Sequence, residues 1–440
     1  MQEFGHRCVL ADDMGLGKTL QLCYALRELG HTGGLPALVV CPASLKYMWQ
    51  REALQQCGLV ADVIEGRTPE EALLFDSEAH ITIINYDILD AWLDKLLEVG
   101  FKTVVFDECQ EIRNPDTKRS VAAHTIARSC EHVLGASGTP IENGPGEFWH
   151  ILNLVRPDLF GSRLDFGMRY ARPKMERGKW SYRGARNTDE LHSYLTEHCM
   201  VRRRKVDVLD LPEKTRSIIP LKLANNHAKE YKHADEDFLG WLRRKSPGRA
   251  RRATRNQALT RLGYLRRLAA KLKLKQAVGW AHEWLRLNPT EQLVCFGYHT
   301  PLMRVLAKHL PDTVVVTGTT PLRQRQAAVD AFQQGQARCF AGQITAAGTG
   351  LTLTAASNVA FFELDWVPAR LSQAEDRVHR IGQDNFSHAY YLIALGTVEE
   401  WLCNLLQDKQ QGISGCLDGG TNNMDIDLRD LLLKHYYHTA

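Results

Sequence analysis

The stretch LADDMGLGKTLQ, residues 10–21, decides the fold of the first part of this chain. It matches most of the phosphate-binding pattern in which Gly is followed by four residues and then by Gly-Lys-Ser/Thr. Gly17, Lys18 and Thr19 are in place, but Asp12 stands where the first glycine is expected. The apolar run CVLA precedes the loop and a helical pattern follows it, which is the strand–turn–helix context that a phosphate loop requires.

The residue types of this loop suit nucleotide phosphates. Gly15 and Gly17 let backbone N–H groups approach the phosphates, and a helix that begins at Lys18 adds its dipole. Lys18 can reach the β- and γ-phosphates, and the Thr19 hydroxyl can ligate Mg²⁺. Asp12 is compatible with this function if the loop enters with a different bend. The alternative is a chance glycine-rich turn.

A second motif, VVFDE, places two carboxylates at the end of an apolar strand. Asp107 is predicted to hold Mg²⁺ beside the loop, and Glu108 to orient and deprotonate the attacking water. In QAEDRVHRIGQ (373–383), Arg377 and Arg380 are three residues apart, which predicts one helical face suited to the charge on a transferring phosphoryl group. ATP would then bind between two lobes, because the loop and the arginines belong to different halves of the chain.

The alternation of strands and helices predicts an α/β fold of two parallel-sheet lobes joined through a basic helical region. The 440 residues are too many for one ordinary core, and no apolar run approaches the roughly 18 residues of a membrane span. The predicted strands are residues 8–11, 37–41, 81–85, 102–108, 133–137, 292–296, 313–317, 338–342 and 358–364.

The charge is uneven although its net value is only +4. Residues 243–275 hold thirteen Lys and Arg and no Asp or Glu, so the rest of the chain carries −9. This asymmetry favours contact with DNA phosphates, for which Arg251, Arg252 and Arg255 are candidates. The alternative is a solvated helix face.

Eleven scattered cysteines without a Cys-x-x-Cys pair argue against a disulfide framework and a zinc site, and favour reduced thiols in an intracellular protein.

Taken together, these motifs resemble the Swi/Snf-type ATPases of helicase superfamily 2. The resemblance rests on DDMGLGKT, in which Asp12 is normal for the family, and on DECQ (107–110), SGTPIEN (137–143), AAGTGLTLTAAS (346–357) and QAEDRVHRIGQ. The HARP-type annealing-helicase branch is the most similar, through FGMRYARPK (166–174), VRRRKVDVLDLPEK (201–214) and FGYHTPLMRVLAKHL (296–310).

The resemblance implies two RecA-like lobes with helical protrusions. We expect lobe 1 at 1–200, a basic helical linker at 201–275, lobe 2 at 276–412 and a tail at 413–440. Asp12 and Gln373 would join the loop residues at the nucleotide, and Ser44, Thr349 and Gly350 would contact DNA. Trp49 could be a DNA contact or a core residue, and Trp366 could face the cleft or the core.

The implied function is an ATP- and Mg²⁺-dependent translocase on double-stranded or branched DNA, acting as a monomer. A strand-separating helicase and an inactive DNA-binding scaffold are the alternatives. Gln110 stands where the family often has His. A family helix upstream of the loop is expected to be missing, because either the chain is truncated or its start is misplaced. No reader domain is visible, so targeting is absent or supplied by a protein partner.

Overall fold

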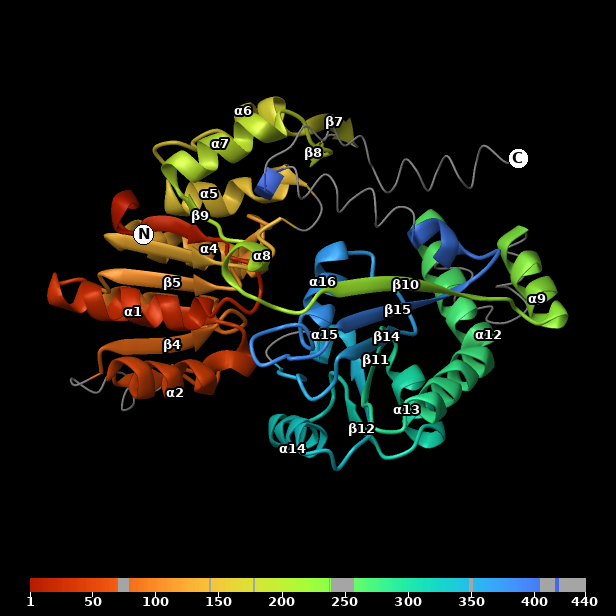
Figure 1. Ribbon diagram of the computed structural model, residues 1–440. Helices are drawn as coiled ribbons and strands as arrows, with labels where there is room; N and C mark the ends of the chain where they lie inside the picture. The colour runs from red at the N-terminus through yellow and green to blue at the C-terminus, as the bar shows by residue number, and fades with distance from the viewer. Residues whose placement is uncertain are drawn as a thin grey trace. The chain divides into compact units, whose positions relative to one another are not determined.

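The computed structural model describes residues 1–69, 79–141, 144–176, 179–236, 238, 257–347, 351–403 and 416–418. The chain forms two compact units: unit 1 comprises residues 1–209 and 409–426, and unit 2 comprises residues 210–408 and 427–440 (Figure 1). Among the described residues no helix is long and apolar enough to cross a membrane. All eleven cysteines are free, and nine of them are buried.

Unit 1 is built on a seven-stranded, all-parallel sheet in the order β3-β4-β2-β5-β6-β1-β9. Its strands are β1 (Arg7–Leu10), β2 (Ala37–Cys41), β3 (Ala61–Val63), β4 (Ile81–Asn85), β5 (Thr103–Asp107), β6 (His132–Ala136) and β9 (Met200–Val201). The longer helices are α1 (Lys18–His31), α2 (Lys46–Cys57), α3 (Leu89–Val99), α4 (Lys118–Ser129), α5 (Trp149–Val155), α6 (Arg163–Tyr170) and α7 (Thr188–His198). Shorter pieces are α8 (Lys205–Val208), the 3₁₀ turns η1 (Gln2–Phe4), η2 (Ala43–Leu45), η3 (Cys109–Ile112) and η4 (Pro145–Glu147), and a hairpin of β7 (Arg172–Glu176) and β8 (Lys179–Arg183).

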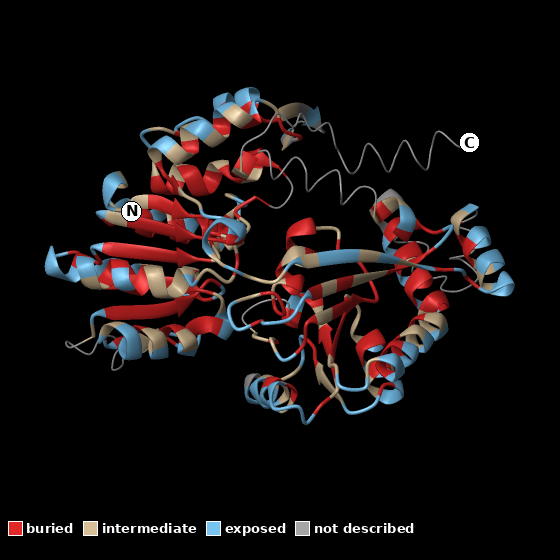
Figure 2. Ribbon diagram, viewed as in Figure 1, coloured by how far each residue is buried: buried red, intermediate tan, exposed pale blue. Residues whose placement is uncertain are grey.

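Both faces of this sheet are covered, which explains why its strands are apolar throughout rather than alternating with polar residues. On one face, α1 and α2 pack with Leu22, Leu26 and Trp49 against alternate strand residues such as Val39 and Val105. The helices α3 to α7 pack on the opposite face. In Figure 2 the strands of this sheet are accordingly mostly red, the colour of buried residues.

Unit 2 contains a second all-parallel sheet, of six strands in the order β10-β15-β14-β11-β13-β12. The strands are β10 (Lys214–Leu221), β11 (Leu293–Gly297), β12 (Thr313–Val316), β13 (Cys339–Gln343), β14 (Asn358–Phe361) and β15 (Ser387–Ala394). The helices are α9 (Asn225–Glu236), α12 (Gln257–Leu287), α13 (Thr300–His309), α14 (Leu322–Gln333), α15 (Ile344–Ala347) and α16 (Pro368–Glu375). The predicted fold class, two parallel-sheet α/β lobes, is confirmed.

One segment differs from the expectation of a helical linker at 201–275. Lys214–Leu221 forms β10, which pairs with β15 along its whole length at an edge of the second sheet. Most of its residues are exposed or half-buried, so it lacks the apolar run that marks the inner strands. Pro220 fits an edge strand because the missing N–H there removes no bond from the sheet interior.

Helix α12 carries a charge that is internal to the fold. Lys273 and Glu399 are each about 1% exposed, and Lys273 Nζ lies 2.6 Å from Glu399 Oε2 and 2.5 Å from the carbonyl oxygen of Leu392. The backbone N–H of Ala394 also donates to Glu399 Oε2, at 2.9 Å. Burial raises the pKa of Glu399, and the Lys273 charge opposes that rise.

We predict that Lys273→Met destabilises unit 2 by about 3–5 kcal/mol, because it leaves the Glu399 carboxylate buried without its cation. Lys271→Met removes the same charge from an exposed position on the same helix and should cost no more than about 0.5 kcal/mol. Urea unfolding followed by circular dichroism would measure both. Equal midpoints for the two variants would contradict the prediction.

Candidate nucleotide site

The phosphate loop connects β1 to α1 at the carboxyl edge of the first sheet. Its two glycines adopt left-handed backbone conformations, with φ of 86° at Gly15 and 70° at Gly17, which other residues rarely adopt. Helix α1 begins at Lys18, as predicted, and Gly17 provides no side-chain cap. The first backbone N–H groups of α1 therefore receive no acceptor from a capping side chain, as a phosphate-binding helix start requires.

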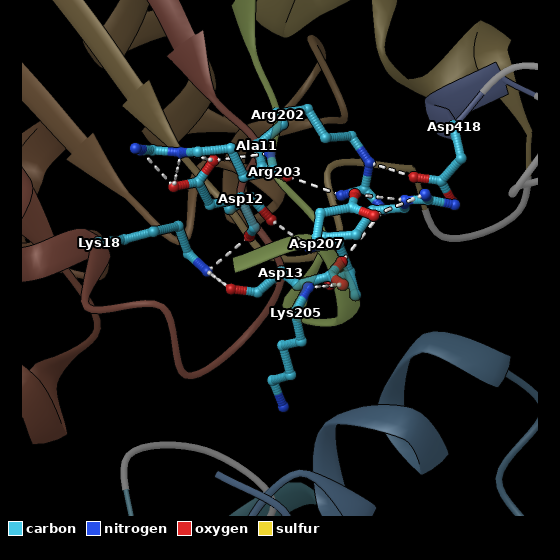
Figure 3. Close-up of polar contacts among 12 residues, drawn as sticks. Ala11, Asp12, Asp13, Lys18, Arg202, Arg203, Lys205, Asp207 and Asp418 are labelled. Atoms are coloured by element: carbon cyan, nitrogen blue, oxygen red, sulfur yellow. Dashed lines mark hydrogen bonds and ion pairs between the residues drawn. The ribbon is translucent and has the colours of Figure 1, made fainter. Parts of the chain in front are cut away.

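Asp12, the residue in place of the first glycine, fixes the start of the loop through hydrogen bonds to its carboxylate (Figure 3). Its side chain is completely buried. The Arg203 guanidinium donates to both carboxylate oxygens, with Nη2 2.6 Å from Oδ2, and the Arg203 backbone N–H donates to Oδ1 at 2.9 Å. Gln21 Nε2 donates to Oδ2 at 3.0 Å and to the Leu16 carbonyl at 2.8 Å. The bend that the sequence left open is thus held by an ion pair between the buried Asp12 carboxylate and the half-exposed Arg203.

The neighbouring acid, Asp13, is held by the same segment of chain. Arg202 Nη2 lies 3.1 Å from Asp13 Oδ1, and the backbone N–H of Lys205 donates to Asp13 Oδ2 at 3.0 Å. Arg202 also donates to the Ala11 carbonyl at 2.7 Å and pairs with Asp418 at 2.6 Å. Residues 202–205 therefore line the entrance to the phosphate loop, although about 190 residues separate them from it.

Lys18 itself reaches back over the loop. Its Nζ donates to the carbonyl oxygens of Asp12 and Asp13 at 2.9 and 3.2 Å. Burial lowers the pKa of Lys18, whereas Glu108 and Asp107 oppose that shift. A Cβ at Gly138 would lie 3.1 Å from Lys18 Nζ and 2.4 Å from Met14 Cγ, so SGTPIEN begins in direct contact with the loop.

The predicted pair of acids follows β5 at the same edge of the sheet. Asp107 is aligned with Ala136 of β6, which is in turn aligned with Leu10 of β1, so the acid and the loop end at the same level. Burial raises the pKa of Asp107, and the Glu108 charge adds to the rise. The hydrogen bond from Trp49 and the Lys18 charge oppose it.

Glu108 adopts a left-handed backbone conformation, with φ of 52° and ψ of 52°. A non-glycine residue in this region stores strain, and such residues concentrate at functional sites. Its carboxylate accepts a hydrogen bond from Gln110 Nε2 at 2.7 Å. Gln110, which stands where the family often has His, thus orients the side chain that is predicted to act on water.

Two aromatic residues that approach Asp107 from the core were not predicted to do so. Trp49 is fully buried and its Nε1 donates to Asp107 Oδ2 at 2.7 Å, so the core interpretation of this residue is correct and the DNA-contact alternative is wrong. Tyr86 donates its hydroxyl to the Asp107 carbonyl at 2.8 Å. By contrast, Ser44 is exposed in η2, directly after β2.

In unit 2, the prediction that Arg377 and Arg380 share a helical face is wrong. Helix α16 ends at Glu375, and both arginines lie in the turns that follow. There the Arg377 carbonyl accepts from Leu353 N–H, and Gln383 Nε2 donates to the Val378 carbonyl, so tertiary contacts replace the helical pattern. Arg377 Nη1 donates to the Leu351 carbonyl at 3.2 Å, and Arg380 Nη1 to Thr352 Oγ1 at 2.9 Å.

The end of α16 is fixed by a buried carboxylate. Glu375 is fully buried and accepts two hydrogen bonds of 2.7 Å from Arg216 and one of 2.6 Å from Tyr391. It also forms an ion pair with Lys214, whose Nζ lies 3.0 Å from Oε2. Burial by itself would raise the pKa of Glu375, but Lys214, Arg216 and Tyr391 outweigh it and lower the pKa to about 2. Gln373, on the same helix, is buried, and its Nε2 has no hydrogen-bond partner among the described residues.

The basic segment divides into internal and exposed charges. Arg251, Arg252, Arg255, Thr349 and Gly350 lie outside the described residues. Arg261 pairs with Asp235, Lys273 pairs with Glu399, and Arg266 is buried with its guanidinium over the rings of Tyr298 and Trp366, so acids elsewhere in the chain partly neutralise this segment.

The remaining described charges form what we call the basic stripe: Arg267, Lys271 and Lys275. They recur every four residues on α12, which places them on one face of the helix, and all three are exposed. Within the described part of the chain none of the three forms an ion pair.

Comparison with known proteins identifies two domains in the chain. The SNF2-related domain matches residues 2–277, and the helicase conserved C-terminal domain matches residues 280–382. The SWI/SNF-related matrix-associated actin-dependent regulator of chromatin subfamily A-like protein 1 of Xenopus tropicalis is 33% identical over 416 residues, which are 92% of this chain and 42% of that protein. The human DNA annealing helicase and endonuclease ZRANB3 is 30% identical over 448 residues, 96% of this chain and 40% of that protein.

A solved structure, the Sulfolobus solfataricus SWI2/SNF2 ATPase core in complex with dsDNA, is 26% identical, covers 94% of this chain and 90% of its own, and has a TM-score of 0.43. The chain spans about two fifths of the length of the two curated relatives.

A phosphate loop and an Asp-Glu pair at one sheet edge, in a chain with a second parallel sheet, define an ATP hydrolase of the two-lobed helicase type. The chain belongs to the SNF2-related family of helicase superfamily 2, whose members include the annealing helicases found among its relatives.

We predict that Glu375→Gln removes part of the acid sensitivity of unit 2. A carboxylate whose folded pKa is about 2 stabilises the fold fully above the ordinary value of 4.5 and loses that contribution as the pH falls towards 2. The total is about 3 kcal/mol. Urea midpoints between pH 5 and pH 3 should fall less steeply for Glu375→Gln than for the wild type.

The control is Glu283→Gln, which removes an exposed carboxylate that is paired with Arg286. Its pH slope should match the wild type closely, since exposed pairs contribute little. An unchanged slope for Glu375→Gln would rule out the proposed stabilisation.

Proposed function

We propose that this chain is an ATP-dependent, DNA-stimulated translocase on double-stranded DNA, which remodels DNA structures or protein–DNA complexes. The observation that carries the proposal is the basic stripe, which an ATPase of this family presents on a helix of the unit that lacks the phosphate loop. The relatives support it, because one is named a DNA annealing helicase and another a regulator of chromatin.

The residues at the loop support distinct roles in hydrolysis. Lys18 would exchange the loop carbonyls for the β- and γ-phosphates of ATP, since its amine already lies inside the loop. Glu108, steadied by Gln110, would accept the proton of the attacking water. The roles of Arg377 and Arg380 as transition-state stabilisers stay predictions from their residue type. The role of Gln373 as a nucleotide contact stays a prediction from the resemblance.

The oxygen ligands at the loop fit Mg²⁺. In nucleotide sites Mg²⁺ is held by one or two protein oxygens together with phosphates, and it prefers hard oxygen ligands. The Thr19 hydroxyl and the Asp107 carboxylate would supply those oxygens, and bound Mg²⁺ would neutralise charge on the phosphates. The raised pKa of Asp107 fits a buried carboxylate that needs a cation beside it.

The basic stripe supports contact with DNA phosphates rather than with bases. Three cations at four-residue intervals span about 12 Å of helix, a length over which duplex DNA presents several phosphates. Such contacts position a protein on DNA without reading its sequence. A DNA-dependent ATPase assay would distinguish this proposal from the inactive scaffold, and a strand-displacement assay would distinguish it from a separating helicase.

We predict that Lys18→Ala abolishes ATP hydrolysis while leaving DNA affinity within about twofold, since the basic stripe is on another unit. Phosphate release and fluorescence anisotropy with a labelled duplex would measure the two properties. Lys102→Ala, an exposed residue just before β5, is the control and should retain full activity. Normal hydrolysis by Lys18→Ala would overturn the assignment of the loop.

We predict that the double variant Arg267→Glu with Lys271→Glu weakens binding to two unrelated duplexes equally and flattens the salt dependence. The slope of log K against log salt should lose about 0.9 for each phosphate contact removed. The matched control is Arg304→Glu with Lys308→Glu, which changes the same residue types at the same spacing on exposed positions of α13. If both double variants lose the same affinity, net charge explains the effect and the stripe is not the contact.

A further inference from the structure

The carboxylate of Asp107 is held by two hydrogen bonds from different parts of unit 1. The backbone N–H of Glu108 donates to Oδ1 at 3.0 Å, and the indole N–H of Trp49 donates to Oδ2 at 2.7 Å. A carboxylate oxygen has two acceptor positions, so each oxygen keeps one for another ligand. The two donors therefore fix the rotation of the carboxylate while leaving part of it available.

The donor on Trp49 cannot easily move. Trp49 is fully buried in α2, and its ring packs in the core formed with α1 and the strands β2 and β5. An indole offers one N–H in a rigid ring, so packing of the ring sets the direction of the bond. Tyr86, also buried, adds a hydrogen bond of 2.8 Å to the Asp107 carbonyl and so fixes the backbone beneath the carboxylate.

We propose that Trp49 is a positioning residue for metal–nucleotide binding: its indole N–H holds the Asp107 carboxylate in the orientation that receives Mg²⁺. The proposal rests on the proposed function, in which Asp107 is a metal ligand. Hydrogen-bond partners of metal ligands typically change metal affinity by about 10–100-fold when they are removed. Trp49 thus acts on Mg²⁺ affinity and leaves the chemical step to other residues.

The same unit offers a matched comparison. Trp92 in α3 is also buried, at 4% exposure, and its Nε1 donates to the carbonyl of Gly66, a residue that follows β3, at 3.0 Å. Trp49→Phe and Trp92→Phe therefore each remove one indole N–H and shrink one buried ring. They differ in whether the lost partner is Asp107.

The experiment measures Mn²⁺ binding to the full chain by electron paramagnetic resonance, with a non-hydrolysable ATP analogue present. We expect Trp49→Phe to weaken Mn²⁺ binding by about tenfold. The Mg²⁺ concentration for half-maximal hydrolysis should rise by the same factor, with kcat at saturating Mg²⁺ near the wild-type value. Trp92→Phe should lower the melting temperature comparably and leave both metal measurements unchanged.

Equal Mn²⁺ affinities for Trp49→Phe, Trp92→Phe and the wild type would overturn the proposal and make Trp49 a core residue only. Asp107→Asn separates the proposed metal-ligand role of Asp107 from the proposed positioning role of Trp49. If Asp107→Asn binds Mn²⁺ normally, the metal-ligand role itself fails; if it loses Mn²⁺ and Trp49→Phe does not, only the role of Trp49 fails.

A second measurement uses folded protein if Trp49→Phe does not fold. In wild-type protein with ¹⁵N-labelled indoles, one N–H resonance should move when Asp107→Asn removes the carboxylate charge, and the same resonance should move when Mg²⁺ and the nucleotide analogue are added to the wild type. An indole spectrum that is insensitive to Mg²⁺ would overturn the proposal.

Discussion

The shape of the phosphate loop depends on the buried carboxylate of Asp12. Asp12 is completely buried, and an unpaired carboxylate in that position would be too costly for the fold to tolerate. Arg203 satisfies it through the guanidinium and the backbone N–H, and Gln21 completes the set. The first strand of unit 1 and the segment after its last strand are therefore tied together at the nucleotide site. The contact that sets the shape of the loop is therefore also the contact that joins the two ends of unit 1's chain.

The parallel sheet then determines which groups can meet at this loop. All seven strands of the large sheet in unit 1 run in one direction, so their carboxyl ends share an edge, where open α/β sheets bind their ligands. Loop, acid pair and Gly138 reach that edge from three different strands. Trp49 is the exception, because it approaches Asp107 through the core from helix α2. The sheet edge thus brings the phosphate loop and the acid pair together. The core behind it supplies a hydrogen bond to one of these groups, the Asp107 carboxylate.

Local patterns in the sequence predicted the strands and the start of the first helix, because these features depend on residues that are close in the chain. All nine predicted strands are found, and α1 begins at Lys18, because apolar runs and glycine punctuation act over a few residues. Contacts between distant residues could not be predicted in this way: Arg203 and Asp12 are 191 residues apart, and β10 carries too few apolar residues to be recognised without its partner β15. Counting charges also failed to distinguish Lys273, which is internal, from Lys271, two residues away on the surface.

The left-handed backbone of Glu108 has a consequence for natural variation. Glycine or asparagine would adopt this conformation with less strain, by roughly 1–2 kcal/mol relative to other residues. On the proposed role of Glu108 in hydrolysis, a chain that loses the acid at this position would become more stable and less active. Stability and the proposed activity would then favour different residues at position 108.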